Sequence, residues 1–98
     1  MCGAKAGGPA TEGLDLTDEA VVQGVVLRDG SPVSGAYVRL LDGGGEFTAE
    51  VPTSATGQFR FFAAPGSWTL RALSRHGNGD LTLDATRGVN EVGLSVAA

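Results

Sequence analysis

Few residues of this chain of 98 amino acids carry side chains suited to covalent or metal chemistry. Cys2 is the single cysteine, so its thiol is the one strong nucleophile and no disulfide can form within the chain. His76 is the single histidine, and no cysteine or second histidine stands near it at the spacing of a metal site. Asp80 and Asp84 lie on one face of a short predicted strand. For His76 and the two aspartates we expect solvated side chains, without a metal site or a cofactor.

An enzyme would need acid and base groups that converge on one place. The sequence contains no motif or spacing that brings such groups together. It therefore predicts a protein without catalytic residues, which acts through binding.

The charge and the hydropathy of the sequence exclude some classes of binding partner. The formal net charge of −4 and the single lysine, Lys5, argue against a nucleic-acid groove, which needs clustered cationic side chains. The first residues lack the apolar core of a signal peptide, and no stretch approaches the roughly 20 apolar residues of a membrane span. We expect a cytoplasmic protein that binds neither nucleic acid nor membranes.

The elements that position these side chains are short strands. Residues 1–17 are rich in Gly, Ala and Pro without periodicity and predict a flexible tail, followed by one domain at 18–98. Turn signals separate apolar–polar alternations at about the spacing of a sandwich. The sequence predicts an all-β fold, an antiparallel β-sandwich of about seven strands with immunoglobulin-like or prealbumin-like Greek-key order. The predicted strands are 20–28, 36–42, 46–53, 58–61, 67–72, 81–83 and 92–96, with a loop at 76–79.

The clearest strand signal is the run 58–72, where two alternating stretches flank an Ala-Pro-Gly turn and predict a β-hairpin. Alternation places the large apolar residues of each stretch on one side of its strand. Together with other inward positions they form the predicted core: Val26, Val38, Leu40, Phe59, Phe61, Trp68 and Leu70.

Three arginines occupy strand positions that face away from this core, namely Arg39, Arg60 and Arg71. If their strands are neighbours, they form a cationic stripe interleaved with glutamates, which could recognise an acidic partner or a sulfur oxyanion. Cross-strand charge pairing that keeps a sheet soluble is the commoner arrangement.

Apolar side chains also point away from the predicted core. If Tyr37, Leu41 and Phe62 cluster, they would form an exposed patch of the kind that marks partner docking or self-association. Exposed edge strands of a sandwich can in addition pair with another chain or with a second copy.

The order of signals from Val22 onward resembles the carboxypeptidase-regulatory-like and transthyretin-like β-sandwich domains. The resemblance rests on the segments 24–26, 29–40, 56–61 and 65–70. More narrowly, Met1-Cys2 and the segments 38–42, 46–51, 54–57, 59–74 and 77–80 resemble a small actinobacterial family, often labelled SseC-like, that tends to accompany thiosulfate sulfurtransferases. This resemblance implies the sandwich fold and a loose tie to sulfur metabolism, without a demonstrated activity. For a module that acts through a protein partner, it makes a sulfurtransferase the candidate. The alternative is that Cys2 itself accepts sulfur as a persulfide.

Two catalytic relatives of this sandwich do not match the sequence. Hydroxyisourate hydrolases carry several histidines and a C-terminal Tyr-Arg-Gly-Ser, whereas this chain has a single histidine and ends Ser95-Val96-Ala97-Ala98. Intradiol dioxygenases hold iron with two tyrosines and two histidines, which Tyr37 and His76 alone cannot supply.

Overall fold

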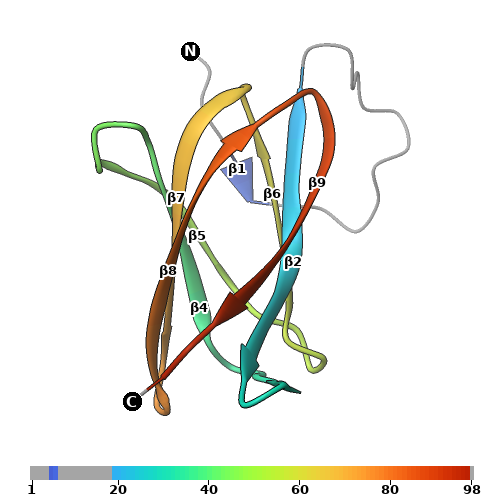
Figure 1. The fold of residues 1–98 in the computed structure, drawn as a ribbon, viewed down its shortest axis with the longest axis vertical. Helices are drawn as coiled ribbons and strands as arrows, with labels where there is room; N and C mark the ends of the chain where they lie inside the picture. The colour runs from blue at the N-terminus through green and yellow to red at the C-terminus, as the bar shows by residue number, and fades with distance from the viewer. Residues whose placement is uncertain (1–4, 7–18, 98) are drawn as a thin grey trace.

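The computed structural model describes residues 5–6 and 19–97. Strands are the only regular secondary structure in these residues, and they form two sheets packed face to face (Figure 1). The predicted all-β sandwich is confirmed. The strands are Lys5–Ala6 (β1), Ala20–Arg28 (β2), Ser31–Pro32 (β3), Tyr37–Leu41 (β4), Phe47–Pro52 (β5), Gln58–Ala63 (β6), Gly66–Ser74 (β7), Gly77–Ala85 (β8) and Gly88–Ser95 (β9).

The first sheet has the order β1-β6-β2-β3, with β9 also paired to β2, and the second has the order β5-β4-β7-β8. All pairs are antiparallel except β2 with β9, which run parallel from Ala20–Gly88 to Leu27–Ser95. This one pair departs from the predicted antiparallel arrangement. It arises because β9 follows β8 of the other sheet and crosses over the end of the sandwich before it enters beside β2 (Figure 1).

The core lies between the sheets, where the inward side chains of both meet. All the predicted core residues belong to its buried cluster, which also contains Val22, Val33, Ala36, Val51, Ala63, Ala72, Ala85, Leu94 and Val96. The rings of Phe59 and Phe61 contact each other with centroids 6.2 Å apart. Alternation along each strand is therefore sufficient to identify these inward positions.

The predicted hairpin at 58–72 is wrong, although its apolar side chains do enter the core. β6 pairs with β1 and β2, whereas β7 pairs with β4 and β8, so the chain passes from one sheet to the other at residues 64–65. The indole Nε1 of Trp68 donates a hydrogen bond to the carbonyl oxygen of Ala64 at 2.8 Å and so fixes this corner. A Pro-Gly turn between two alternating stretches is compatible with a hairpin within one sheet and with a crossover between the two sheets. In both cases each strand presents one face to the same core.

The predicted loop at 76–79 is also wrong. β8 begins at Gly77, and only Arg75 and His76 form the turn after β7. Gly77 supplies the positive φ of 128° that the turn requires. Gly79 lies within the strand, where the absence of a side chain lets β9 approach: a Cβ atom there would be 1.9 Å from the carbonyl oxygen of Ser95.

Gly24 of β2 likewise allows β9 to approach, on the side of β9 that faces β2. A Cβ atom on Gly24 would lie 1.9 Å from the carbonyl oxygen of Val92. Beyond the end of β9, Ala97 pairs with Asn78 of β8 through backbone hydrogen bonds of 3.2 and 3.1 Å. The last strand therefore joins the two sheets along one side of the sandwich.

Candidate functional site

A row of charged side chains crosses the outer face of the second sheet. Arg39 of β4 and Arg71 of β7 are direct cross-strand partners. Each has an acidic partner on its other side: Arg39 Nε lies 3.1 Å from Glu50 Oε2, and Arg71 Nε lies 3.0 Å from Asp80 Oδ1. The row reads acid, arginine, arginine, acid across β5, β4, β7 and β8.

This row carries no net charge. Asp80 raises the pKa of the Arg71 guanidinium above its ordinary value, by accepting hydrogen bonds from it and by charge attraction. A raised arginine pKa means that the Arg71 guanidinium keeps its charge throughout the neutral range and gives up its proton only in strongly alkaline solution. The alternative of cross-strand charge pairing thus describes Arg39 and Arg71 better than a cationic stripe.

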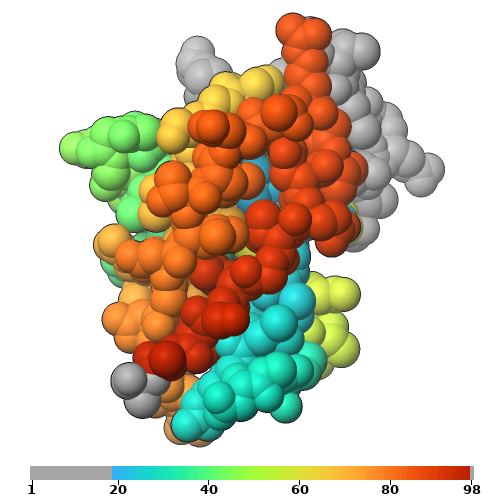
Figure 2. All heavy atoms as spheres, viewed as in Figure 1, coloured from blue at the N-terminus to red at the C-terminus, as the bar shows by residue number. Residues whose placement is uncertain are grey.

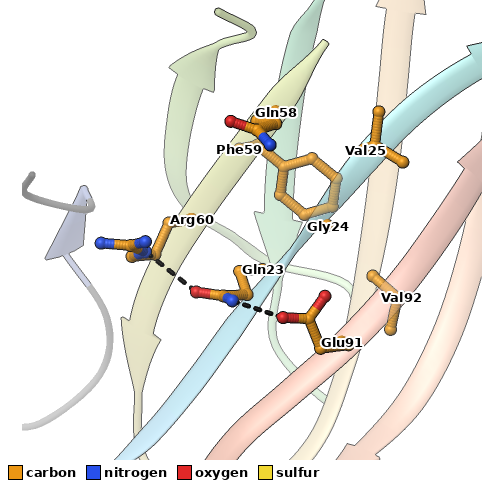
Figure 3. Close-up of a pocket in the computed structure, with 8 residues that line it drawn as sticks. All are labelled: Gln23, Gly24, Val25, Gln58, Phe59, Arg60, Glu91 and Val92. Atoms are coloured by element: carbon orange, nitrogen blue, oxygen red, sulfur yellow. Dashed lines mark hydrogen bonds between the residues drawn. The ribbon is translucent and has the colours of Figure 1, made fainter. Parts of the chain in front are cut away.

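Arg60 does not join this row, because β6 belongs to the first sheet. Its Nε donates to Gln23 Oε1 at 3.0 Å, and Gln23 Nε2 in turn donates to Glu91 Oε2 (Figure 3). These side chains rise from β6, β2 and β9 and border a hollow of about 210 Å³ together with Gln58 and Val25. The condition for a stripe of all three arginines, that their strands are neighbours, is therefore not met, and such a stripe does not form.

Tyr37 and Phe47 flank the charged row on the same outer face. Tyr37 lies in register with Pro52 and Leu73, and its side chain is 52% exposed. Phe47 is 60% exposed, because a register shift between Leu40 and Leu41 turns it outward at the start of β5. The alternation of the sequence alone gave no sign of this bulge.

The predicted exposed patch of Tyr37, Leu41 and Phe62 does not form. Leu41 is 7% exposed and Phe62 is 5% exposed, so neither is available to a partner. Phe62 lies on an inner strand, in register with Lys5 of β1 and with the fully buried Val21 of β2. Sequence alternation shows that Phe62 points away from the main core, but it does not show that this second face is covered.

Another group of polar side chains gathers at the end of the sandwich where the β2–β3 and β7–β8 turns lie side by side (Figures 1 and 2). His76 stands in the wall between two hollows of about 310 and 300 Å³. One is bordered by Arg28, Asp29 and Ser31, and the other by Ser34, Ser74 and Arg75. His76 is thus solvated, as expected, but it has cationic neighbours that the sequence did not indicate.

The family model "Protein of unknown function (DUF1416)" matches residues 2–96. The chain belongs to this family.

Relatives of this DUF1416 chain come from mycobacteria. An uncharacterised protein of Mycolicibacterium smegmatis is 60% identical over 87 residues, which are 87% of this chain and 97% of that protein. The uncharacterised proteins Rv0814c and Rv3118 of Mycobacterium tuberculosis are each 56% identical over 99 residues, covering 98% of this chain and 99% of theirs. The actinobacterial character expected from the sequence is supported.

The fold of this DUF1416 chain is similar to parts of several solved structures of other proteins. A DUF3823 family protein from Parabacteroides merdae has a TM-score of 0.63 at 20% identity, over 82% of this chain but only 46% of that protein. The dioxygenase domain of a dioxygenase–carbohydrate-binding protein fusion from Streptomyces sp. SirexAA-E has a TM-score of 0.62 at 14% identity, over 96% of this chain and 86% of that domain. Catechol 1,2-dioxygenase from Acinetobacter has a TM-score of 0.61 at 11% identity, over 96% and 57%. At these identities the likeness concerns the fold alone.

Cys2 lies outside the described residues, and within the predicted tail only Lys5–Ala6 is described, paired with β6. In residues 5–6 and 19–97 no group of three or more His, Cys, Asp or Glu side chains is arranged to hold a metal ion. None of the described residues forms a helix that is long and apolar enough to span a membrane.

Proposed function

We propose that this domain is a non-catalytic accessory module that binds another protein through the outer face of the β5-β4-β7-β8 sheet. The observation that carries the proposal is the exposure of Tyr37 and Phe47 on that face, on either side of the charged row. Aromatic and arginine side chains are the residues that most often dominate binding energy at protein interfaces. This face combines both kinds on one rigid sheet.

The spacing of the aromatic side chains suits a protein partner. Phe47 lies in register with Leu41, four positions along β4 from Tyr37. At a strand rise of roughly 3.3 Å per residue, the two aromatic positions are about 13 Å apart along the strands. Such a span fits two separate contacts with a protein surface, whereas the hollows described above lie on other parts of the molecule.

The charged row also favours a protein as the partner that binds this face. Since Arg39 and Arg71 each bind a carboxylate within the sheet, a partner does not have to neutralise them. Their guanidinium groups and the neighbouring carboxylates can still form hydrogen bonds with a partner. Such bonds contribute more to the specificity of binding than to its affinity. A charge-balanced face between two aromatic side chains is therefore suited to protein recognition and poorly suited to a polyanion.

The proposal can be tested with a variant that removes both aromatic side chains, Tyr37→Ser combined with Phe47→Ser. Val89→Ser is the matched control, because Val89 is 50% exposed but lies on β9 of the other sheet. Immobilised wild-type chain should retain a stoichiometric partner from the native extract. We expect the double variant to lose that partner and Val89→Ser to keep it. Equal retention by the double variant would contradict the proposal.

A second copy of the chain is one outcome of this test. Size-exclusion chromatography with light scattering measures the mass of the purified protein. A monomer at micromolar concentration is expected if the partner is a different protein. A dimer that Tyr37→Ser with Phe47→Ser dissociates would make this face a self-association surface, and pairing through the edge strands would remain a prediction to be tested separately.

The second candidate function is sulfur transfer through Cys2. The family model begins at residue 2, so Cys2 lies within the span that defines the family. The tie to sulfur metabolism comes from the sequence resemblance alone. In this reaction a persulfide on a sulfurtransferase gives its outer sulfur to the Cys2 thiolate, and the transferase thiol is released. Intact mass after incubation with thiosulfate and a sulfurtransferase should rise by one sulfur atom in wild type and not in Cys2→Ser. No increment in wild type would eliminate this candidate.

A further inference from the structure

The two hollows beside His76 are formed by turns whose conformations are fixed. Asp29 and Gly30 have φ angles of 52° and 82°, as a two-residue hairpin turn with positive φ at both positions requires. In the opposite turn, Ser74 Oγ donates to the carbonyl oxygen of Gly77 at 2.8 Å and accepts from the backbone N–H of His76 at 3.1 Å. The residues around the hollows are therefore held on a defined frame.

The arginines at this end differ from those on the sheet faces. Arg39 and Arg71 are paired with carboxylates, and Arg60 binds Gln23. Arg28 and Arg75 have no side-chain partner among the described residues. Arg28 borders one of the two hollows and Arg75 borders the other, and His76 borders both. In a chain whose net charge is −4, unpaired cationic side chains at one place are an uncommon arrangement.

We propose that this end of the sandwich binds a small oxyanion of the sulfate or phosphate type, held by Arg28, Arg75 and His76. Guanidinium groups bind such oxyanions through paired, charge-assisted hydrogen bonds. Hydroxyl groups that can donate to the remaining oxygens come from Ser31 and Ser34 at the rims of the two hollows. This site is separate from the protein-binding face and does not depend on it.

Among the described residues, Asp29 is the one acidic residue that borders the hollows. Two arginines against one aspartate leave the site cationic even when His76 is neutral. The carboxylate of Asp29 should weaken the binding of an anion, and this repulsion gives the proposal a direct test. Asparagine at this position accepts the same positive φ, so Asp29→Asn removes the charge without disturbing the turn.

The test is a titration of isotope-labelled protein with sodium sulfate, followed by backbone amide chemical shifts, with sodium chloride of equal ionic strength as reference. Saturable shifts are expected in residues 28–35 and 74–77. Arg28→Ser and Arg75→Ser should each weaken binding about fivefold, as expected for exposed charge pairs. Arg87→Ser is the matched control, because Arg87 is also exposed and has no side-chain partner among the described residues, but it follows β8 at the opposite end of that strand.

Two results with the wild type and the arginine variants would overturn the oxyanion site, and a third comes from Asp29→Asn. One is the absence of saturable shifts with both sulfate and inorganic phosphate. The other is an equal loss of affinity in Arg28→Ser, Arg75→Ser and Arg87→Ser, which would indicate a general charge effect. Asp29→Asn should bind sulfate about threefold more tightly, since it removes one like charge at an exposed site; unchanged or weaker binding by this variant would also contradict the proposal. A wild-type amide spectrum outside the two turns establishes that each variant is folded.

Discussion

Gly79 of β8 and Ser95 of β9 lie so close that a Cβ atom on the glycine would be 1.9 Å from the serine carbonyl oxygen. This approach brings the end of β9 against the second sheet, where Ala97 pairs with Asn78. The same strand is bound to the first sheet along β2. The contact between these two residues is therefore a point where the two layers are joined by backbone rather than by side-chain packing.

Gly79→Ala should destabilise the fold by about 3 kcal/mol, because the new methyl group meets backbone atoms that cannot turn aside. Urea unfolding followed by Trp68 fluorescence measures this change. Gly93→Ala is the control: nothing lies within 4 Å of its added Cβ atom, so a change within about 1 kcal/mol is expected. Equal stability of the two variants would mean that β9 does not approach β8 this closely.

Gly24→Ala should release β9 from β2, since its added Cβ atom would be 1.9 Å from the carbonyl oxygen of Val92. The readout is amide hydrogen exchange. Amides of β9 should exchange faster, while those between β4 and β7, which share no residue with this contact, should keep their protection at moderate denaturant. Uniform acceleration across both sheets would show instead that the sandwich opens as a single unit.

Thr53→Val should lower the free energy of unfolding by about 2–4 kcal/mol, because the buried hydroxyl forms hydrogen bonds with two backbone groups. Thr53 Oγ1 accepts from the N–H of Ala36 at 3.0 Å and donates to the carbonyl oxygen of Val33 at 2.9 Å. Valine has nearly the same shape and leaves both groups buried without a partner. Thr53→Ser keeps the hydroxyl and should retain most of the stability in the same unfolding assay; a serine variant as unstable as the valine variant would argue that methyl packing is what matters.

Trp68→Ala should lower the free energy of unfolding by about 3–5 kcal/mol, because the indole is buried in the core cluster. Trp68→Phe keeps an aromatic ring but removes the donor to the carbonyl oxygen of Ala64, so a loss of about 1–2 kcal/mol is expected. Thermal unfolding by far-ultraviolet circular dichroism measures both variants without relying on tryptophan emission. A wild-type midpoint for Trp68→Ala would be incompatible with this packing.

The inward positions were predictable because alternation acts within each strand. Phe59, Phe61 and Leu70 face the core whichever sheet their strands join. Sheet membership depends on contacts far apart in the sequence, which alternation does not encode. The predicted hairpin at 58–72 was wrong for this reason, and for the same reason Arg60 does not join Arg39 and Arg71 in a stripe.

The exposed surface was predictable only in part. Tyr37 follows simple alternation on β4 and is exposed as expected. Phe47 was missed because the bulge beside Leu41 changes which side chains share a face. The end of the sandwich around His76 was missed because it joins turns from distant parts of the chain, and the one local signal was the Asp-Gly pair at 29–30.

The parallel pairing of β2 with β9 also has a kinetic consequence. The β4–β5 and β7–β8 pairs connect strands that follow one another, so the second sheet can begin to form early. β2 can pair with β3 and β6 earlier, but its parallel partner β9 lies near the far end of the described chain, and pairings of such long range are slow to nucleate. We therefore expect an early refolding species in which the second sheet is formed but its apolar inner face is still exposed to solvent. The two sheets should pack together only after β9 has paired with β2.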